Sequence, residues 1–309
     1  MPEICDYENS PWRTEFWHGR EYEDRAERIA LAHMLPPHGT RICEIGAGFG
    51  RLAQFYLGYD QIILIDYART MLHQAREHLE NDSRFTHPER SAKGAQSKDA
   101  SRFIFAAADL YNLPLADSAL DTAVTVRVLH HVADIPRAFA EINRVVRPQG
   151  TYLTEFANKR HLKSILRYWL TRRSPNPHTL TPYEFVKLNF DFHPRYIADE
   201  LAKNNFVVQD QRAVSTFRIG FLKRTVPANF LAAVDGLIQH PTSNLQISPS
   251  IFYRNQSCKP GTPAINQSLW RCPTCGSTQI QESPEALLCL ACARAYPIID
   301  GIIDFKSQM

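Results

Sequence analysis

Short apolar runs alternate with amphipathic segments over the first half of the chain. Residues 16–35, FWHGREYEDRAERIALAHML, carry apolar side chains at helical spacing and end before two prolines, which predicts an amphipathic helix. Short apolar runs, which predict strands, follow at 41–45, 61–65, 102–108, 121–126 and 150–156. Helical patterns lie between them at 51–58, 69–79 and 135–146. Strands that alternate with helices predict an α/β fold with a doubly wound parallel sheet.

The second half of the pattern is less regular. Residues 81–101 are polar and lack periodicity, which indicates a solvated loop. Residues 159–173, KRHLKSILRYWLTRR, form an apolar helical face with basic residues around it. PRYIADELAKNNFVV (194–208) predicts a helix and then a strand, and FYR near 252 suggests a last strand.

A change in composition suggests where the domains divide. Residues 255–268 are rich in Pro, Ser, Asn and Gln, as interdomain linkers often are. We therefore expect a large domain over 1–254, a linker at 255–268 and a small domain over 269–309. Within the large domain, the core would span about 20–157, and 158–254 would form a substrate or lid region. A chain of 309 residues agrees with about two domains.

Charge and composition argue against several classes of protein. The apolar fraction of 44% is that of a globular protein, and a formal charge of +3 gives little support to non-specific nucleic-acid binding. No apolar run approaches the roughly 20 residues of a transmembrane helix, and the N-terminus lacks the pattern of a signal peptide. We expect a cytoplasmic protein, in which paired cysteines more often bind metal than form disulfides.

Three glycines follow the first predicted strand. Gly46, Gly48 and Gly50 leave room for a ligand close to the backbone, at the sheet edge where doubly wound folds bind ligands. Asp66 ends the second predicted strand, 22 positions after Glu44, and is placed to accept hydrogen bonds from both hydroxyls of a ribose.

The spacing of the loop separates three classes of nucleotide-derived cofactor. A dinucleotide fingerprint needs G-x-G-x-x-G, whereas this chain has G-A-G-F-G, and the Gly-Lys-Ser/Thr ending of a P-loop is absent. Glu44, just before the loop, would repel a pyrophosphate but would attract a cofactor that carries an ammonium group.

At these residues the chain resembles the class I S-adenosylmethionine-dependent methyltransferases, in the branch that acts on quinones and other small molecules. The resemblance covers about residues 20–157, a Rossmann-like fold, and rests on CEIGAGFGRL, LIDYARTMLHQAR, AADLYNLPLADSALDTAVTVRVLHHV and RVVRPQGTYLTEF. It departs from the family at Pro148-Gln149-Gly150, where Pro-Gly-Gly is frequent, in a turn remote from the chemistry.

The resemblance implies a role for individual positions. Glu44, Gly46, Ala47, Gly48 and Gly50 would hold the amino-acid part of S-adenosylmethionine. Asp66 would take the ribose, and Asp109 with Leu110 the adenine. Tyr67 is a further cofactor-binding candidate, and Arg127 would line both the cofactor site and the methyl-transfer pocket. His130 and His131 follow a strand and are further catalytic candidates at the rim; the alternative is a packed or helix-capping histidine.

Two CxxC pairs near the C-terminus predict a metal site. Thirteen residues separate the pair Cys272 and Cys275 from the pair Cys289 and Cys292. Four thiolates from two such turns form the closed tetrahedral shell of structural Zn²⁺. A redox dithiol or an iron–sulfur site is the alternative, without the surrounding βαβ pattern that would favour it.

The ending YPIIDGIIDF resembles small zinc-ribbon proteins that partner and activate methyltransferases. That resemblance implies a ribbon that stabilises the enzyme or helps to present a substrate or a protein partner.

The methyl acceptor stays open, as a small molecule or an RNA. The basic segment 159–173 has four interpretations: a surface for RNA phosphates, a helix on a membrane surface, a lid over an apolar substrate, or a helix that packs its apolar face on the core. Two alternatives to an enzyme also remain, namely a scaffold that binds the cofactor without turnover and a zinc-ribbon module for protein interaction.

Overall fold

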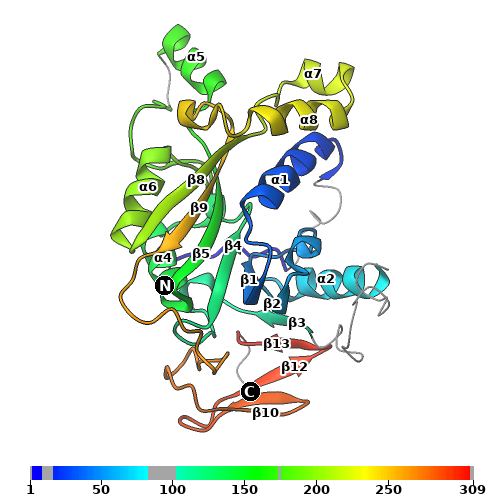
Figure 1. Cartoon of the computed structure of the whole chain (residues 1–309), viewed down its shortest axis with the longest axis vertical. Helices are drawn as coiled ribbons and strands as arrows, with labels where there is room; N and C mark the ends of the chain where they lie inside the picture. Colours follow the sequence, from blue (N-terminus) through cyan, green and yellow to red (C-terminus); the bar gives the residue numbers. More distant parts are fainter. Residues whose placement is uncertain (1, 9–16, 83–101, 173–174, 307–309) are drawn as a thin grey trace.

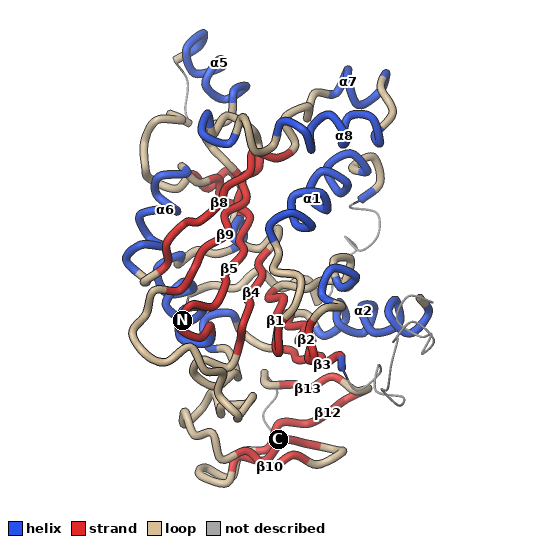
Figure 2. The backbone as a smooth tube through the Cα atoms, viewed as in Figure 1, coloured by secondary structure: helices blue, strands red, loops and turns tan. Residues whose placement is uncertain are grey.

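A single large sheet organises the part of the chain that the computed structural model describes, residues 2–8, 17–82, 102–172 and 175–306. In this part eleven strands join in the order β10-β11-β12-β13-β3-β2-β1-β4-β5-β9-β8 (Figures 1 and 2). The predicted loop at 81–101 lies outside the described residues from 83 onward.

The centre of the sheet is parallel, as the alternation of strands and helices predicted. Its strands are β1 (Gly39–Ile45), β2 (Tyr59–Asp66), β3 (Phe103–Ala107), β4 (Leu120–Thr125) and β5 (Val146–Ala157). Strand β9 (Ser250–Ser257) pairs antiparallel with β5, and β8 (Phe206–Val214) pairs antiparallel with β9. Residues 42–45 of β1 and 62–65 of β2 are buried, which fits their mainly apolar sequence.

Helices cover both faces of the sheet. Helix α1 (Glu21–Met34), α2 (Arg69–Asn81) and α8 (Ala228–Ile238) contribute to one apolar core, and α4 (Ile135–Val145) and α6 (Pro194–Lys203) to the other. Each helix buries the side chains that recur at helical spacing. The doubly wound α/β architecture is therefore confirmed.

The helix predicted after the glycine loop is shorter than its pattern suggests. Residues 51–58 contain one 3₁₀ turn, Ala53–Tyr56, instead of an α-helix. The chain returns to β2 at Tyr59, so too few residues are available for several helical turns. Three other short 3₁₀ segments are described, Leu110–Asn112, Leu129–His131 and Ser243–Leu245.

The region after β5 contains α5 (Leu162–Thr171), the hairpin of β6 (Tyr183–Val186) and β7 (Asn189–Asp191), and α7 (Gly220–Thr225). Helices α5, α7 and α8 lie at one end of the molecule (Figure 1). No described helix has the length and apolar character that crossing a bilayer requires.

The cysteine-bearing segment extends the large sheet at the other end of the molecule. It comprises β10 (Ile280–Glu282), β11 (Ala286–Cys289), β12 (Ala295–Ile299) and β13 (Ile302–Asp304). Strand β13 pairs parallel with β3, and Trp270 and Tyr296 join one of the apolar cores of the large domain. The segment is therefore in direct contact with the rest of the fold.

The segment predicted as a linker forms hydrogen bonds with the core at several points. Strand β9 runs three residues beyond the predicted boundary at 254, to Ser257. Lys259 Nζ donates to the carbonyl oxygens of Asn143 (2.7 Å) and Arg144 (2.9 Å), and the Asn266 amide donates to Ser118 O (2.9 Å). The predicted domain boundaries remain a proposal.

Candidate functional site

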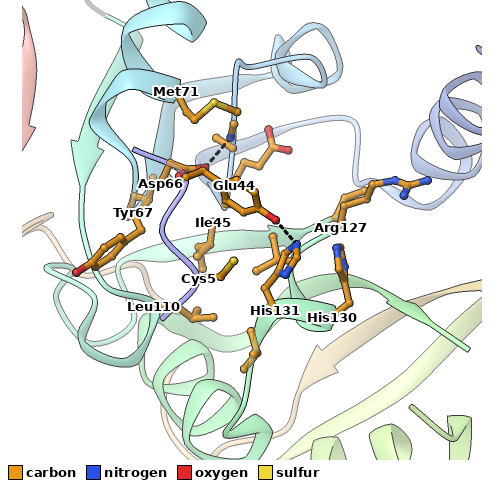
Figure 3. Close-up of a pocket in the computed structure, with 18 of the residues that line it drawn as sticks. Cys5, Glu44, Ile45, Asp66, Tyr67, Met71, Leu110, Arg127, His130 and His131 are labelled. Atoms are coloured by element: carbon orange, nitrogen blue, oxygen red, sulfur yellow. Dashed lines mark hydrogen bonds between the residues drawn. The ribbon is translucent and has the colours of Figure 1, made fainter. Parts of the chain in front are cut away.

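One cavity brings most of the predicted site residues together at the carboxyl ends of the parallel strands. It has a volume of about 660 Å³ and opens between the ends of β1, β2 and β4. Figure 3 shows that Glu44, Asp66, Arg127 and His131 surround the same space. The predicted residues that line it are Glu44, Gly46, Ala47, Gly48, Asp66, Tyr67, Asp109, Leu110, Arg127, His130 and His131.

The glycine loop has the backbone geometry that its sequence predicts. Gly46, Gly48 and Gly50 have φ of +78°, +55° and +75°, in the left-handed region that favours glycine. A Cβ at Gly46 would lie 2.3 Å from Val128 Cγ2. Gly50 lies outside the cavity lining, and a Cβ there would meet Ala75 Cβ at 3.2 Å. Gly50 thus shapes the turn and allows close packing on α2.

Asp66 holds the loop as well as facing the cavity. Its Oδ2 accepts a hydrogen bond from the Gly48 amide at 2.8 Å, and its Oδ1 accepts one from the Ala68 amide at 2.9 Å. Burial raises the pKa of the carboxyl, and the hydrogen bonds from Ala68 and Gly48 oppose that shift. The Gly46 and Ala47 amides also donate to Ile65 O, at 2.7 and 2.9 Å, so the end of β2 holds the loop through both its backbone and the Asp66 side chain.

Glu44 is an acid at the end of β1 with little exposure to solvent. Its side chain is buried, and Oε2 has no hydrogen-bond partner among the residues that the structure describes. Burial raises the pKa of Glu44 to about 8, although the Arg51 guanidinium lowers it in part. A cationic donor from a ligand would satisfy this oxygen, so the site fits a cofactor that carries an ammonium group.

Asp109 and Leu110 form another wall of the cavity. Asp109 Oδ1 accepts a hydrogen bond from the Tyr111 amide at 2.8 Å and so begins the 3₁₀ turn Leu110–Asn112. Burial raises the pKa of Asp109. Tyr67 follows Asp66 at the cavity, and Lys306 Nζ lies 4.3 Å from the centre of its ring.

Arg127 is anchored before any ligand binds. Its backbone has φ of +61°, and its amide donates to Glu155 Oε2 at 2.9 Å. Its guanidinium donates from Nε to Glu27 Oε1 at 2.7 Å, and Glu27 Oε2 accepts from Arg51 at 2.6 Å. Glu27 therefore holds two cavity-lining arginines in place, and the Trp17 ring lies against both guanidinium groups.

His131 has a defined tautomer. Its Nδ1 lies 2.9 Å from the carbonyl oxygen of Leu188, which can only accept, so Nδ1 carries the proton. Nε2 then accepts the hydrogen bond from the Tyr7 hydroxyl, at 2.8 Å. Burial lowers the pKa of His131. The pKa of His130 lies well below its ordinary value, first because the ring is buried and then because His131 and Arg127 disfavour a second positive charge beside them. Both rings are therefore neutral near pH 7.

The N-terminal segment 2–8 lines the cavity, which the sequence did not reveal. Ile4, Cys5 and Tyr7 face the cavity, and Ile4 forms a β-bridge with Val132. Glu8 accepts hydrogen bonds from two backbone amides at the start of α2. No periodicity or motif marks this segment. Trp17, Arg20 and Met71 also line the cavity without a sequence signal.

The four cysteines of the C-terminal segment form one cluster. Their sulfur atoms, from Cys272, Cys275, Cys289 and Cys292, all lie within 4.8 Å of one another. Gly276 has φ of +76°, and its amide donates to Cys272 O at 2.9 Å, which closes the first turn. Four thiolates from two turns match the donors and the compactness of a tetrahedral Zn²⁺ site.

Comparison with known proteins agrees with this geometry. Residues 43–154 match the family model described as a methyltransferase domain. An uncharacterized chloroplastic methyltransferase of Arabidopsis thaliana is 27% identical over 46% of this chain and 38% of its own length. A demethylmenaquinone methyltransferase of Roseiflexus is 32% identical over 46% of this chain and 53% of its own. This chain thus covers well under two thirds of these relatives.

A solved structure shows the same architecture. A candidate S-adenosylmethionine-dependent methyltransferase of Listeria monocytogenes superposes with a TM-score of 0.50, over 77% of this chain and 99% of that one, at 13% sequence identity. Residues 43–154 therefore match the methyltransferase domain family, and the chain shares the Rossmann-like fold of that methyltransferase structure.

Proposed function

We propose that this protein transfers the methyl group of S-adenosylmethionine to a small-molecule acceptor bound in the same cavity. The observation that carries the proposal is the joint placement of Glu44, the glycine loop, Asp66 and Asp109 around one space. The match of residues 43–154 to a methyltransferase domain supports it.

The proposed cofactor site uses a different chemical group for each part of the ligand. Glu44 and the loop of Gly46, Ala47 and Gly48, with Gly50 shaping the turn, would hold the amino-acid part. Asp66 and Tyr67 would take the ribose, and Asp109 and Leu110 the adenine. The bound cofactor supplies an electrophilic methyl group, and the protein supplies alignment, which can contribute about 7–11 kcal/mol.

The proposed acceptor side is formed by Arg127, His130, His131 and Tyr7. Glu27 holds the Arg127 guanidinium, so the arginine can orient a polar acceptor without rearranging. Tyr7 and the neutral His131 form a hydrogen-bonded pair that can accept a proton from an acceptor hydroxyl or amine. A cavity of about 660 Å³ is in the range of small-molecule sites, which favours such a ligand over RNA.

Transfer of label tests the proposed reaction. The zinc-loaded protein would be incubated with S-adenosylmethionine tritiated in its methyl group, together with fractionated metabolites and, separately, RNA. Label in a small-molecule fraction supports the proposal, and label in RNA overturns the acceptor class. Saturable cofactor binding without transfer to any fraction would favour a non-catalytic scaffold.

We further propose that the four-cysteine cluster binds structural Zn²⁺, and that 269–309 forms a zinc ribbon. The compactness of the sulfur cluster and the contact of β13 with β3 support a stabilising role. Presentation of a substrate or a protein partner by this ribbon is the second possibility, and a complex that survives purification would favour it.

Cofactor binding is expected to release a proton below pH 8. Glu44 has its pKa raised to about 8 in the free protein, so it is mostly protonated at pH 7. An ammonium group beside it favours the charged carboxylate, so the proton leaves as the cofactor binds, and affinity rises with pH up to about 8. Calorimetry at pH 7 in two buffers of different ionisation heat measures this release.

A Glu44→Gln variant serves as the control for that experiment. It cannot titrate, so we expect it to bind about tenfold or more weakly and with the same heat in both buffers. Equal heats for the wild-type protein in the two buffers would contradict the proposed contact between Glu44 and the ammonium group.

A further inference from the structure

Large apolar side chains are exposed on the three helices at one end of the molecule. Leu170 is 84% exposed, Leu237 78% and Trp169 64%. Leu166 on α5, Phe221 on α7 and Phe230 on α8 are also exposed. In α5 the buried residue is Ser164, so the alternative in which this helix packs its apolar face on the core is wrong.

The strand directions place α5 and α7 at the same edge of the sheet as the cavity. Strands β5 and β8 both pair antiparallel with β9, so they run parallel to each other and to β4. Helix α5 follows the carboxyl end of β5, and α7 follows that of β8. Figures 1 and 2 show α7 and α8 side by side at this end and α5 at the same end but apart from them, all far from the cysteine-bearing strands. We call these three helices the α5–α7–α8 surface.

The same surface concentrates positive charge. Helices α5 and α7 carry no Asp or Glu, and their basic residues are Lys163, Arg167, Lys223 and Arg224. Lys223 pairs with Glu23 at 2.7 Å, and the one acid of α8, Asp235, is buried. The whole chain, by contrast, has 35 basic and 32 acidic residues. Lys163 and Arg167 are exposed and have no ion-pair partner within the described ranges. Positive charge therefore lies beside the exposed Leu and Trp side chains.

We propose that the α5–α7–α8 surface docks on the face of an anionic lipid bilayer. Exposed Leu, Phe and Trp side chains gain free energy in the boundary between headgroups and acyl chains, while Lys and Arg meet anionic headgroups. In this mode the three helices lie on the surface of the bilayer. Docking in this orientation turns the cavity edge of the sheet toward the bilayer, and it does not depend on the proposed methyl transfer.

Two other occupants fit the surface less well. RNA would use the basic residues and could stack on Trp169, but exposed aliphatic side chains such as Leu170 and Leu237 would then stay in water. A second copy of the chain would place like charges from the two surfaces against each other. Anionic lipid satisfies both the apolar and the basic side chains.

Sedimentation with lipid vesicles tests the proposal on the full-length, zinc-loaded protein. We expect binding to vesicles that contain phosphatidylglycerol, weak binding to pure phosphatidylcholine, and a decrease with added salt. Arg167→Glu should weaken binding about 30-fold, because each charge near the surface contributes a factor of about five and the substitution changes two charge units. Leu170→Ser should weaken it about tenfold through lost apolar burial.

Matched controls lie away from this surface. Lys203→Glu, at the end of α6, makes the same change in charge, and Leu290→Ser, in the cysteine-bearing segment, removes an exposed leucine. Both should bind vesicles as the wild-type protein does. Calorimetry with S-adenosylmethionine reports separately on the fold and the cofactor site, so a failure of the proposed activity is distinguishable from a failure of docking.

Three results would overturn the inference. The first is equal binding to anionic and neutral vesicles, or none to either. The second is a loss in the control variants as large as that in Arg167→Glu and Leu170→Ser. The third is salt-sensitive RNA binding, or a dimer in light scattering that Leu170→Ser dissociates, when vesicles are not bound.

Discussion

Replacement of Asp66 by Ala is expected to weaken S-adenosylmethionine binding by about 100-fold or more. The carboxylate accepts hydrogen bonds from the Gly48 and Ala68 amides and is proposed to accept those of the ribose. A hydrogen bond to a charged group contributes about 1.5–3 kcal/mol, so losing the ribose contacts and loosening the loop reaches this magnitude. Calorimetric titration of the zinc-loaded protein measures it directly.

The strand that carries Asp66 also offers a control. Asp60 lies near the start of β2 and is exposed, so Asp60→Ala should bind the cofactor as the wild-type protein does. Asp66→Asn retains one acceptor oxygen and should bind between the two. Thermal unfolding without ligand shows whether each variant is folded. Undiminished binding by a folded Asp66→Ala protein would remove the proposed cofactor site.

The placement of the glycine loop and Asp66 at one edge of the sheet was predictable because its signals are local in sequence. The glycine loop and Asp66 each sit at the end of a short apolar run, and parallel strands bring such ends to one edge. Their placement around one cavity is what the structure adds.

No sequence pattern predicted that residues 2–8 would line the cavity. Tyr7 contacts His131 across 124 positions, and nothing in the pattern of 2–8 indicates that pairing. The pairing of β13 with β3 is equally long-range: three of the four residues of the run IIDF are apolar, but its composition does not identify the strand beside it. In α5 the pattern correctly separated an apolar face, whereas whether that face is buried or exposed depends on the rest of the fold.

Removal of the metal should have the second large effect. We expect one Zn²⁺ per chain, and its chelation should unfold the cysteine-bearing segment, because zinc binding in such small sites contributes about 10–16 kcal/mol. Trp270, Tyr296 and Phe305 would then lose their packing, and β3 would become an unpaired edge next to β2. A loss of several kcal/mol predicts a melting temperature at least about 10 °C lower.

Substitutions separate this effect from chelator artefacts. Cys272→Ser combined with Cys289→Ser should eliminate the bound zinc and reproduce the lower melting temperature, since each CxxC turn then supplies a single thiolate. Cys258→Ser removes an exposed cysteine outside the cluster and should retain both the zinc and the stability of the wild-type protein. If the double variant melts at the wild-type temperature, the cluster does not hold the segment together, because the contact between β13 and β3 then persists without the metal.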